Sequence, residues 1–154
     1  MATSDAAEFV ARCHPTIRAI YEYWDRKRGA RPMPARRDID PTEFVLHLPG
    51  IMLVDVVADE RRYVYRLVGT REVEARGQNP TGRPVGESFH GSSRENVLRN
   101  YDRVCRERAV LFDDYHFTSP GGRLLDEQVI FLPLSADGES VSQILVYTHH
   151  RRLP

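Results

Sequence analysis

Three ionisable side chains stand close together near residue 115 and form the cluster in this sequence best suited to chemistry. Asp113, Asp114 and His116 lie in one predicted strand, where Asp114 and His116 share a face because side chains alternate. A histidine beside carboxylates can act as a base or bind a metal ion. The sequence contains no common metal or nucleophile motif, however, and alternating polar residues on a solvated sheet face are the more common cause of such a pattern. A small hydrolase or isomerase that uses Asp114 and His116 is therefore kept as an alternative.

Arg66 is the single residue of greatest chemical interest. It lies in the middle of the apolar stretch 63–68, which we expect to be at least half buried. A buried guanidinium group needs a carboxylate or several carbonyl groups as partners. We therefore expect an ion pair with Asp55, Asp126 or Glu127, and the functional alternative is an anchor for an acidic ligand.

The two cysteines and a basic run between residues 26 and 37 have simpler interpretations. Cys13 and Cys105 fall on the apolar faces of predicted helices, so we expect buried free thiols. Two cysteines are too few for a disulfide framework or a four-ligand zinc site. The basic run is flanked by acidic residues and is interpreted as a solvated surface, although it could contact phosphate, lipid or an acidic partner.

The composition fits a single globular domain of 154 residues. Its 22 basic and 22 acidic residues give a formal charge of zero, which argues against a nucleic-acid partner because such proteins carry a basic excess. No apolar run approaches the length needed to span a bilayer, and the first residues lack a signal-peptide pattern. We expect a cytoplasmic protein with no membrane partner.

An N-terminal helix is predicted within residues 1–28. Asp5 and Glu8 have the spacing of a capping box at its start. Pro15 should kink the helix or delay its start to His14. The apolar residues follow one face of this helix, at Phe9, Cys13, Ile17, Ile20 and Trp24.

The remaining elements predict an α+β fold. A short helix is expected over 40–50 and further helices over 70–76 and 93–108, the last with Ser92 and Glu95 as a capping box. Turn residues separate five predicted strands, at 51–57, 63–68, 110–119, 123–135 and 142–149. This order predicts a five-stranded antiparallel sheet with helices on one face, and the N-terminal helix outside that unit.

The order of elements resembles a PAS domain, and short stretches resemble PAS_5, a family of small stand-alone bacterial PAS-like proteins. The most specific stretch is Tyr65-Arg66-Leu67-Val68-Gly69-Thr70 after the second strand. The resemblance runs from about residue 20 to 148. The other matching stretches are Tyr23-Trp24, Met33-Pro34, Asp38-Ile39-Asp40-Pro41, Leu48-Pro49, Leu53-Val54-Asp55-Val56, Gly77, Thr81-Gly82 and Pro133-Leu134.

The resemblance implies a non-catalytic sensory or regulatory module. PAS domains hold small ligands or partner proteins between the helices and the sheet, and many dimerise through a helix before the first strand. Residues 1–154 would then be one PAS-like domain, with a core at 50–149 and a homodimer formed through the helix within 1–28. The resemblance specifies no ligand, cofactor or signalling partner. A ligand-free adaptor that works through protein contacts is the second alternative.

The same resemblance places the ligand between the 93–108 helix, the 70–76 helix and the concave face of the sheet. If Gly69 starts the helix as in other PAS domains, Tyr63, Tyr65 and Leu67 face this pocket and Arg66 faces the N-terminal helix. We expect the residues that line the site to be Tyr65, Leu67, Phe89, Tyr101, Tyr115 and Tyr147.

Overall fold

A five-stranded antiparallel sheet lies at the centre of the protein, in a computed structural model that describes residues 2–90, 93–118, 121–122 and 124–152. The strand order is β2–β1–β5–β4–β3. The bounds are β1 (Ile51–Val56), β2 (Tyr63–Val68), β3 (Leu111–Thr118), β4 (Leu124–Leu134) and β5 (Gln143–Arg152). The predicted PAS-like sheet is therefore confirmed, and only the end of β5 extends well beyond its predicted bounds.

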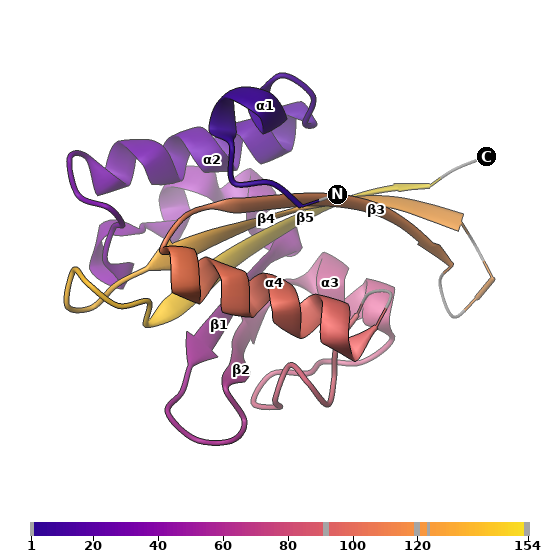
Figure 1. The fold of residues 1–154 in the computed structure, drawn as a ribbon. Helices are drawn as coiled ribbons and strands as arrows, with labels where there is room; N and C mark the ends of the chain where they lie inside the picture. The colour runs from indigo at the N-terminus through magenta and orange to yellow at the C-terminus, as the bar shows by residue number, and fades with distance from the viewer. Residues whose placement is uncertain (1, 91–92, 119–120, 123, 153–154) are drawn as a thin grey trace.

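Helices cover both faces of this sheet. Figure 1 shows α1 and α2 on one side of it and α3 and α4 on the other. The helices are α1 (Ala6–Val10), α2 (Pro15–Arg28), the 3₁₀ helices η1 (Arg36–Asp38) and η2 (Pro41–Gly50), α3 (Thr70–Arg76) and α4 (Arg94–Glu107). We call the face under α1, α2 and η2 the outer face and the face under α3 and α4 the inner face.

The prediction of helices on one face, with the N-terminal helix standing apart, needs correction. Successive residues of β5, such as Leu145 and Val146, are both buried although their side chains point to opposite faces. A sheet that is apolar on both faces must be covered on both. The N-terminal helices supply the second cover.

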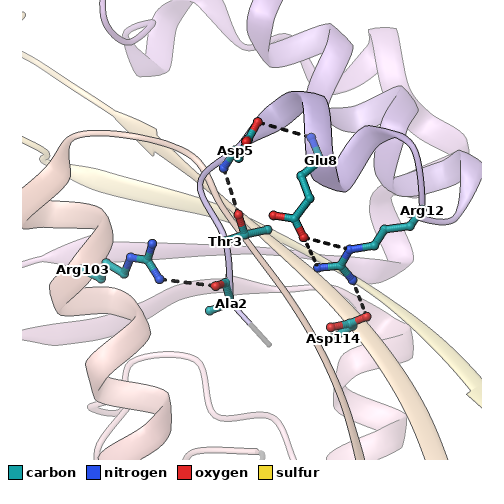
Figure 2. Close-up of polar contacts among 7 residues, drawn as sticks. All are labelled: Ala2, Thr3, Asp5, Glu8, Arg12, Arg103 and Asp114. Atoms are coloured by element: carbon teal, nitrogen blue, oxygen red, sulfur yellow. Dashed lines mark hydrogen bonds and ion pairs between the residues drawn. The ribbon is translucent and has the colours of Figure 1, made fainter.

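The first residues tie α1 to the edge of the sheet (Figure 2). Thr3 pairs with Phe112 of β3 through two backbone hydrogen bonds of 2.7 and 2.8 Å. The Asp5 side chain accepts a hydrogen bond from the Glu8 amide, as predicted for a cap, but the Asp5 amide donates to the Thr3 hydroxyl. The Glu8 carboxylate instead pairs with Arg12. Half of the predicted capping box therefore forms.

The predicted N-terminal helix is two helices because of Pro15. α2 starts at Pro15, and the ring of His14 caps it by accepting from the Thr16 amide. The apolar stripe then lies on the chain's own outer face: Phe9 stacks on Phe112, and the Trp24 indole donates to the Pro133 carbonyl at 2.9 Å. The stripe that suggested a dimer contact is therefore buried within one chain.

An irregularity in β2 changes which side chains share a face. Leu67 pairs with Leu53 and Tyr65 pairs with Val54, so Arg66 has no partner across the ladder. Such a β-bulge inserts one residue and reverses the alternation beyond it. Leu67 therefore lies on the outer face with Leu53, and the prediction that it shares a face with Tyr65 is wrong.

The bulge also explains the position of Arg66. Its side chain is 67% exposed and forms an ion pair with Asp55 at 3.6 Å. The predicted carboxylate partner is confirmed, but the predicted burial is wrong because a bulged edge residue projects into solvent.

The start of α4 differs slightly from the prediction. Ser93 caps it by accepting from the Asn96 amide. Ser92, the predicted cap, lies outside the described residues, as does Pro120 in the predicted turn after β3.

Candidate functional site

An apolar cavity of about 500 Å³ lies between η2 and the outer face of the sheet. Its floor is aliphatic and comes from four strands, through Ile51, Leu53, Leu67, Leu134 and Leu145. Its roof comes from the proline-bounded segment η2, through Pro41, Phe44, Val45 and Leu48. This volume is within the range of small-molecule sites.

Close backbone contact holds one wall of the cavity in place. The Gly69 amide donates to the Ile51 carbonyl at 2.7 Å. A side chain at Gly69 would collide with the carbonyl oxygens of Leu48 and Pro49. The absence of a Cβ atom thus lets the β2–α3 junction pack directly against the end of η2.

The polar side chains of the lining are Arg36 and Thr70, both at exposed positions. Arg36 donates one hydrogen bond to the Ile39 carbonyl at 3.0 Å. The cavity therefore offers an aliphatic interior and a cationic group at its edge.

Aromatic rings pack against one another between α4 and the inner face. The Tyr101 ring lies 5.2 Å from the rings of both Tyr63 and Phe131. Tyr65 is buried beside them, and its hydroxyl accepts from Arg76 at 3.0 Å. These side chains pack against one another where the sequence predicted a ligand.

A cluster of buried ionisable groups lies next to these rings, and we call it the inner cluster: Glu72, His90, Glu127 and His150. Glu72 and Glu127 are only 1% and 3% exposed. His150 bridges them, with Nε2 at 2.6 Å from Glu72 Oε2 and Nδ1 at 3.6 Å from Glu127 Oε2. His90 Nε2 lies 4.0 Å from Glu127 Oε2. The inner cluster thus joins α3 to β4 and β5.

The two histidines of the inner cluster differ in charge. Burial lowers the pKa of His150, but the hydrogen bond to Glu72 and the charges of Glu72 and Glu127 outweigh burial and raise it above its ordinary value. Burial, followed by the nearby Arg76 charge, lowers the pKa of His90 to about 4. Burial thus favours the neutral form of His90, whereas the adjacent carboxylates favour the charged form of His150. Among the described residues, no group of three or more His, Cys, Asp or Glu side chains could hold a metal ion.

The six predicted lining residues do not meet at one place. Tyr65 and Tyr101 are buried on the inner face, whereas Leu67 lines the outer-face cavity. Tyr147 is also on the outer face, with its ring 5.7 Å from that of His47. Phe89 is 38% exposed, and the Tyr115 side chain lies outside the described part of the protein.

The other residues of chemical interest have separate partners. Asp114 forms an ion pair with Arg12 at 2.6 Å, and the exposed His116 lies 3.6 Å from Asp126. Burial raises the pKa of the Cys105 thiol, which keeps it in its unreactive form. Sequence reasoning missed the cavity because its floor comes from four strands that are separated along the chain. It missed the inner cluster because those residues are also far apart and follow no motif.

The sequence matches the PAS_5 family, described as a PAS domain, over residues 12–147. The chain belongs to this PAS family. PAS domains are sensory or regulatory modules and are generally not catalytic, so the family match favours a sensory module over an enzyme. No curated protein matches the sequence.

Solved light-oxygen-voltage (LOV) structures share the fold. A LOV protein of Rhodobacter sphaeroides is 11% identical, with a TM-score of 0.52 over 73% of this chain and 68% of that chain. The LOV domain of a blue-light-activated histidine kinase from Erythrobacter litoralis is 9% identical, with a TM-score of 0.51 over 67% of this chain and 95% of that chain. At such low sequence identity, the structural similarity shows a shared PAS fold and says nothing about a shared ligand. In the described part of this protein, no helix is long and apolar enough to cross a membrane.

Proposed function

We propose that this PAS domain is a sensor whose small apolar ligand binds in the outer-face cavity. The observation that carries the proposal is the cavity itself, about 500 Å³ in volume and walled by aliphatic side chains. Burial of apolar surface in such a cavity drives binding without a precise set of hydrogen bonds.

The way α3 is held suggests how binding is transmitted. Gly69 and Thr70, at the start of α3, belong to the cavity lining, and Glu72 of the same short helix belongs to the inner cluster. A ligand that displaces the start of α3 would change the contact between Glu72 and His150. The signal would then be a shift between two packings of α3 on the sheet.

Native mass spectrometry of the purified protein tests the proposal. We expect a retained small molecule that leaves under denaturing conditions. Val45→Trp should reduce its occupancy because Val45 lines the cavity, whereas Leu46→Trp should not, since its neighbour Leu46 is 89% exposed and does not line it. Equal occupancy in both variants would contradict the proposed site.

Of the six residues predicted to line the site, we propose that Leu67 contacts the ligand directly. Tyr147 supports η2 from the sheet, through His47. Tyr65 and Tyr101 belong to the inner packing and would respond to movement of α3 through Arg76. We assign no ligand contact to Phe89 or Tyr115 in this proposal.

The second candidate is a protein-interaction adaptor. Val45 and Leu67, which line the cavity, are 60% and 50% exposed and leave apolar surface at its mouth. A protein partner could cover this surface. A purified protein that retains no ligand, and takes up none in a screen, would favour this adaptor.

We also propose a homodimer formed through the N-terminal helix, acting in the cytoplasm. The outward side of α2 is available for such a contact and carries Arg18 and Glu22, which pair with each other at 2.8 Å within one chain. The two cysteines are free thiols, as is usual in a reducing compartment. Removal of residues 1–28 is a poor test because it uncovers the sheet, so Arg18→Glu is preferable. Light scattering that gives the same dimer mass for this variant, or a monomer for the original chain, would contradict the dimer contact.

A further inference from the structure

Arg36 is a cation at the edge of the outer-face cavity. Within the part of the chain that the structure describes, no carboxylate lies within ion-pair distance of it. The acidic residues of the same segment are already engaged. Asp38 pairs with Arg31 at 3.0 Å and Glu43 pairs with Lys27 at 2.9 Å.

Asp40, the third acid of this segment, is also engaged. Its carboxylate accepts hydrogen bonds from the amide and hydroxyl of Thr42. Arg36 uses one nitrogen for the Ile39 carbonyl, and a guanidinium group has five N–H donors in a planar fork. The remaining donors can hold a planar anionic group in two-point contact.

The interior of the cavity favours a flexible chain over a planar ring. Phe44 is the one aromatic side chain in the described lining, and its ring already packs edge-on against Tyr23 with centroids 5.0 Å apart. Leu53, Leu134 and Leu145 offer aliphatic surface. They offer no polar atoms to orient a heteroaromatic ring.

We propose that the ligand of this site is a free straight-chain aliphatic carboxylate, with its hydrocarbon chain in the cavity and its head group on Arg36. This inference rests on the proposed function and adds the chemical class of the ligand. It assigns Arg36 as the residue that distinguishes an acid from an uncharged molecule of the same length.

Calorimetric titration of the full chain with octanoate, decanoate and dodecanoate, below their micelle concentrations, tests the proposal. Each added methylene should tighten binding about fourfold while the chain still finds room in the cavity. Arg36→Gln should weaken carboxylate binding about tenfold or more, because charged hydrogen bonds are lost. It should leave binding of the matched alcohol, dodecanol, unchanged.

Arg37→Gln is the matched control. Arg37 is the exposed neighbour in the same 3₁₀ helix and does not line the cavity. Its substitution should leave the affinity for every probe unchanged. A circular dichroism spectrum equal to that of the original chain establishes that each variant is folded.

The outcomes separate this inference from the proposed function. Dodecanol and dodecanoate binding equally, with no effect of Arg36→Gln, would overturn the carboxylate and leave the apolar sensor intact. Failure of both to bind, with no retained ligand, would overturn the apolar sensor as well. Phosphatidylglycerol vesicles that bind through Arg36 while free carboxylates do not would identify a membrane lipid and overturn the free acid.

Discussion

The two faces of the sheet are covered in different ways. On the outer face, η2 and the sheet leave an aliphatic cavity of about 500 Å³ between them. On the inner face, aromatic rings pack closely and the carboxylates of Glu72 and Glu127 are buried around His150. The outer face thus holds a cavity lined by aliphatic groups, whereas the inner face holds buried ionisable groups that pair with one another.

This difference indicates which face of the sheet tolerates a ligand and which face is sensitive to substitution. A void beside aliphatic groups can shrink, expand or receive a guest at modest cost. A buried carboxylate that loses its partner keeps its desolvation penalty without compensation. We therefore expect ligand effects to arise on the outer face and large stability effects to arise on the inner face.

The largest expected effect is removal of Glu72. Glu72→Ala should lower the free energy of unfolding by about 3–5 kcal/mol, because it removes the buried partner of His150 and leaves a cavity. Glu74→Ala on the exposed side of α3 is the control and should change it by less than about 0.5 kcal/mol. Urea unfolding at pH 7 measures both, and equal losses would remove the special role of the inner cluster.

The second-largest expected effect is a loss of folding stability at acidic pH. The pKa of His90 is about 4 in the folded protein and near 6.5 when unfolded. As pH falls from 6.5 to 4, the unfolded chain binds a proton that the folded chain does not, so stability falls by about 3 kcal/mol.

Unfolding curves across this pH range check the prediction. His90→Asn should remove the contribution of His90 to the change of unfolding free energy with pH. The contribution of His149, whose pKa is also about 4, should remain. An unchanged slope in the variant would show that His90 is already protonated or exposed. The raised pKa of His150 acts in the opposite sense, and its stabilising effect is lost as pH rises above its folded value.

Substitution of two leucines tests the difference between close packing and the cavity wall on the outer face. Leu132 and Leu145 lie opposite each other in the ladder and are both buried, but Leu145 lines the cavity. Leu132→Ala should cost about 4 kcal/mol and Leu145→Ala about 2 kcal/mol, within the usual range for such truncations. Thermal and urea unfolding of the two variants would contradict the cavity if Leu145→Ala were the more damaging.

The smallest effect is expected for the exposed ion pair. Arg66→Ala removes the contact with Asp55, which solvent already screens, and should change stability by less than about 1 kcal/mol. A loss as large as that of Glu72→Ala, in the same unfolding assay, would show that exposure does not separate the two kinds of ion pair.

Most of the fold could be predicted from the sequence. The bounds of β2 and α3 were predicted as they occur, because turn residues and apolar periodicity mark both ends. The cover on the second face was missed. The stripe on α2 predicts an apolar partner surface, and periodicity does not show whether that surface belongs to the same chain.

The candidate site was less predictable, for a reason visible at Arg66. Alternation places Tyr65 and Leu67 on one face, and no sequence signal marks the bulge that separates them. The pairing of Glu72 with His150 was equally hidden, because 78 positions separate them along the chain. Local sequence patterns are sufficient to predict the order of the helices and strands. Both sites depend instead on contacts between elements that are distant along the chain.

The bulge has a consequence for aligning this chain with other PAS domains. Up to Tyr65, a column-by-column alignment with a regular strand pairs residues that share a face. At Leu67 the same alignment pairs an outer-face leucine with an inner-face residue. Binding roles transferred along β2 beyond Arg66 must therefore be assigned after a gap of one residue, by facing direction and not by column.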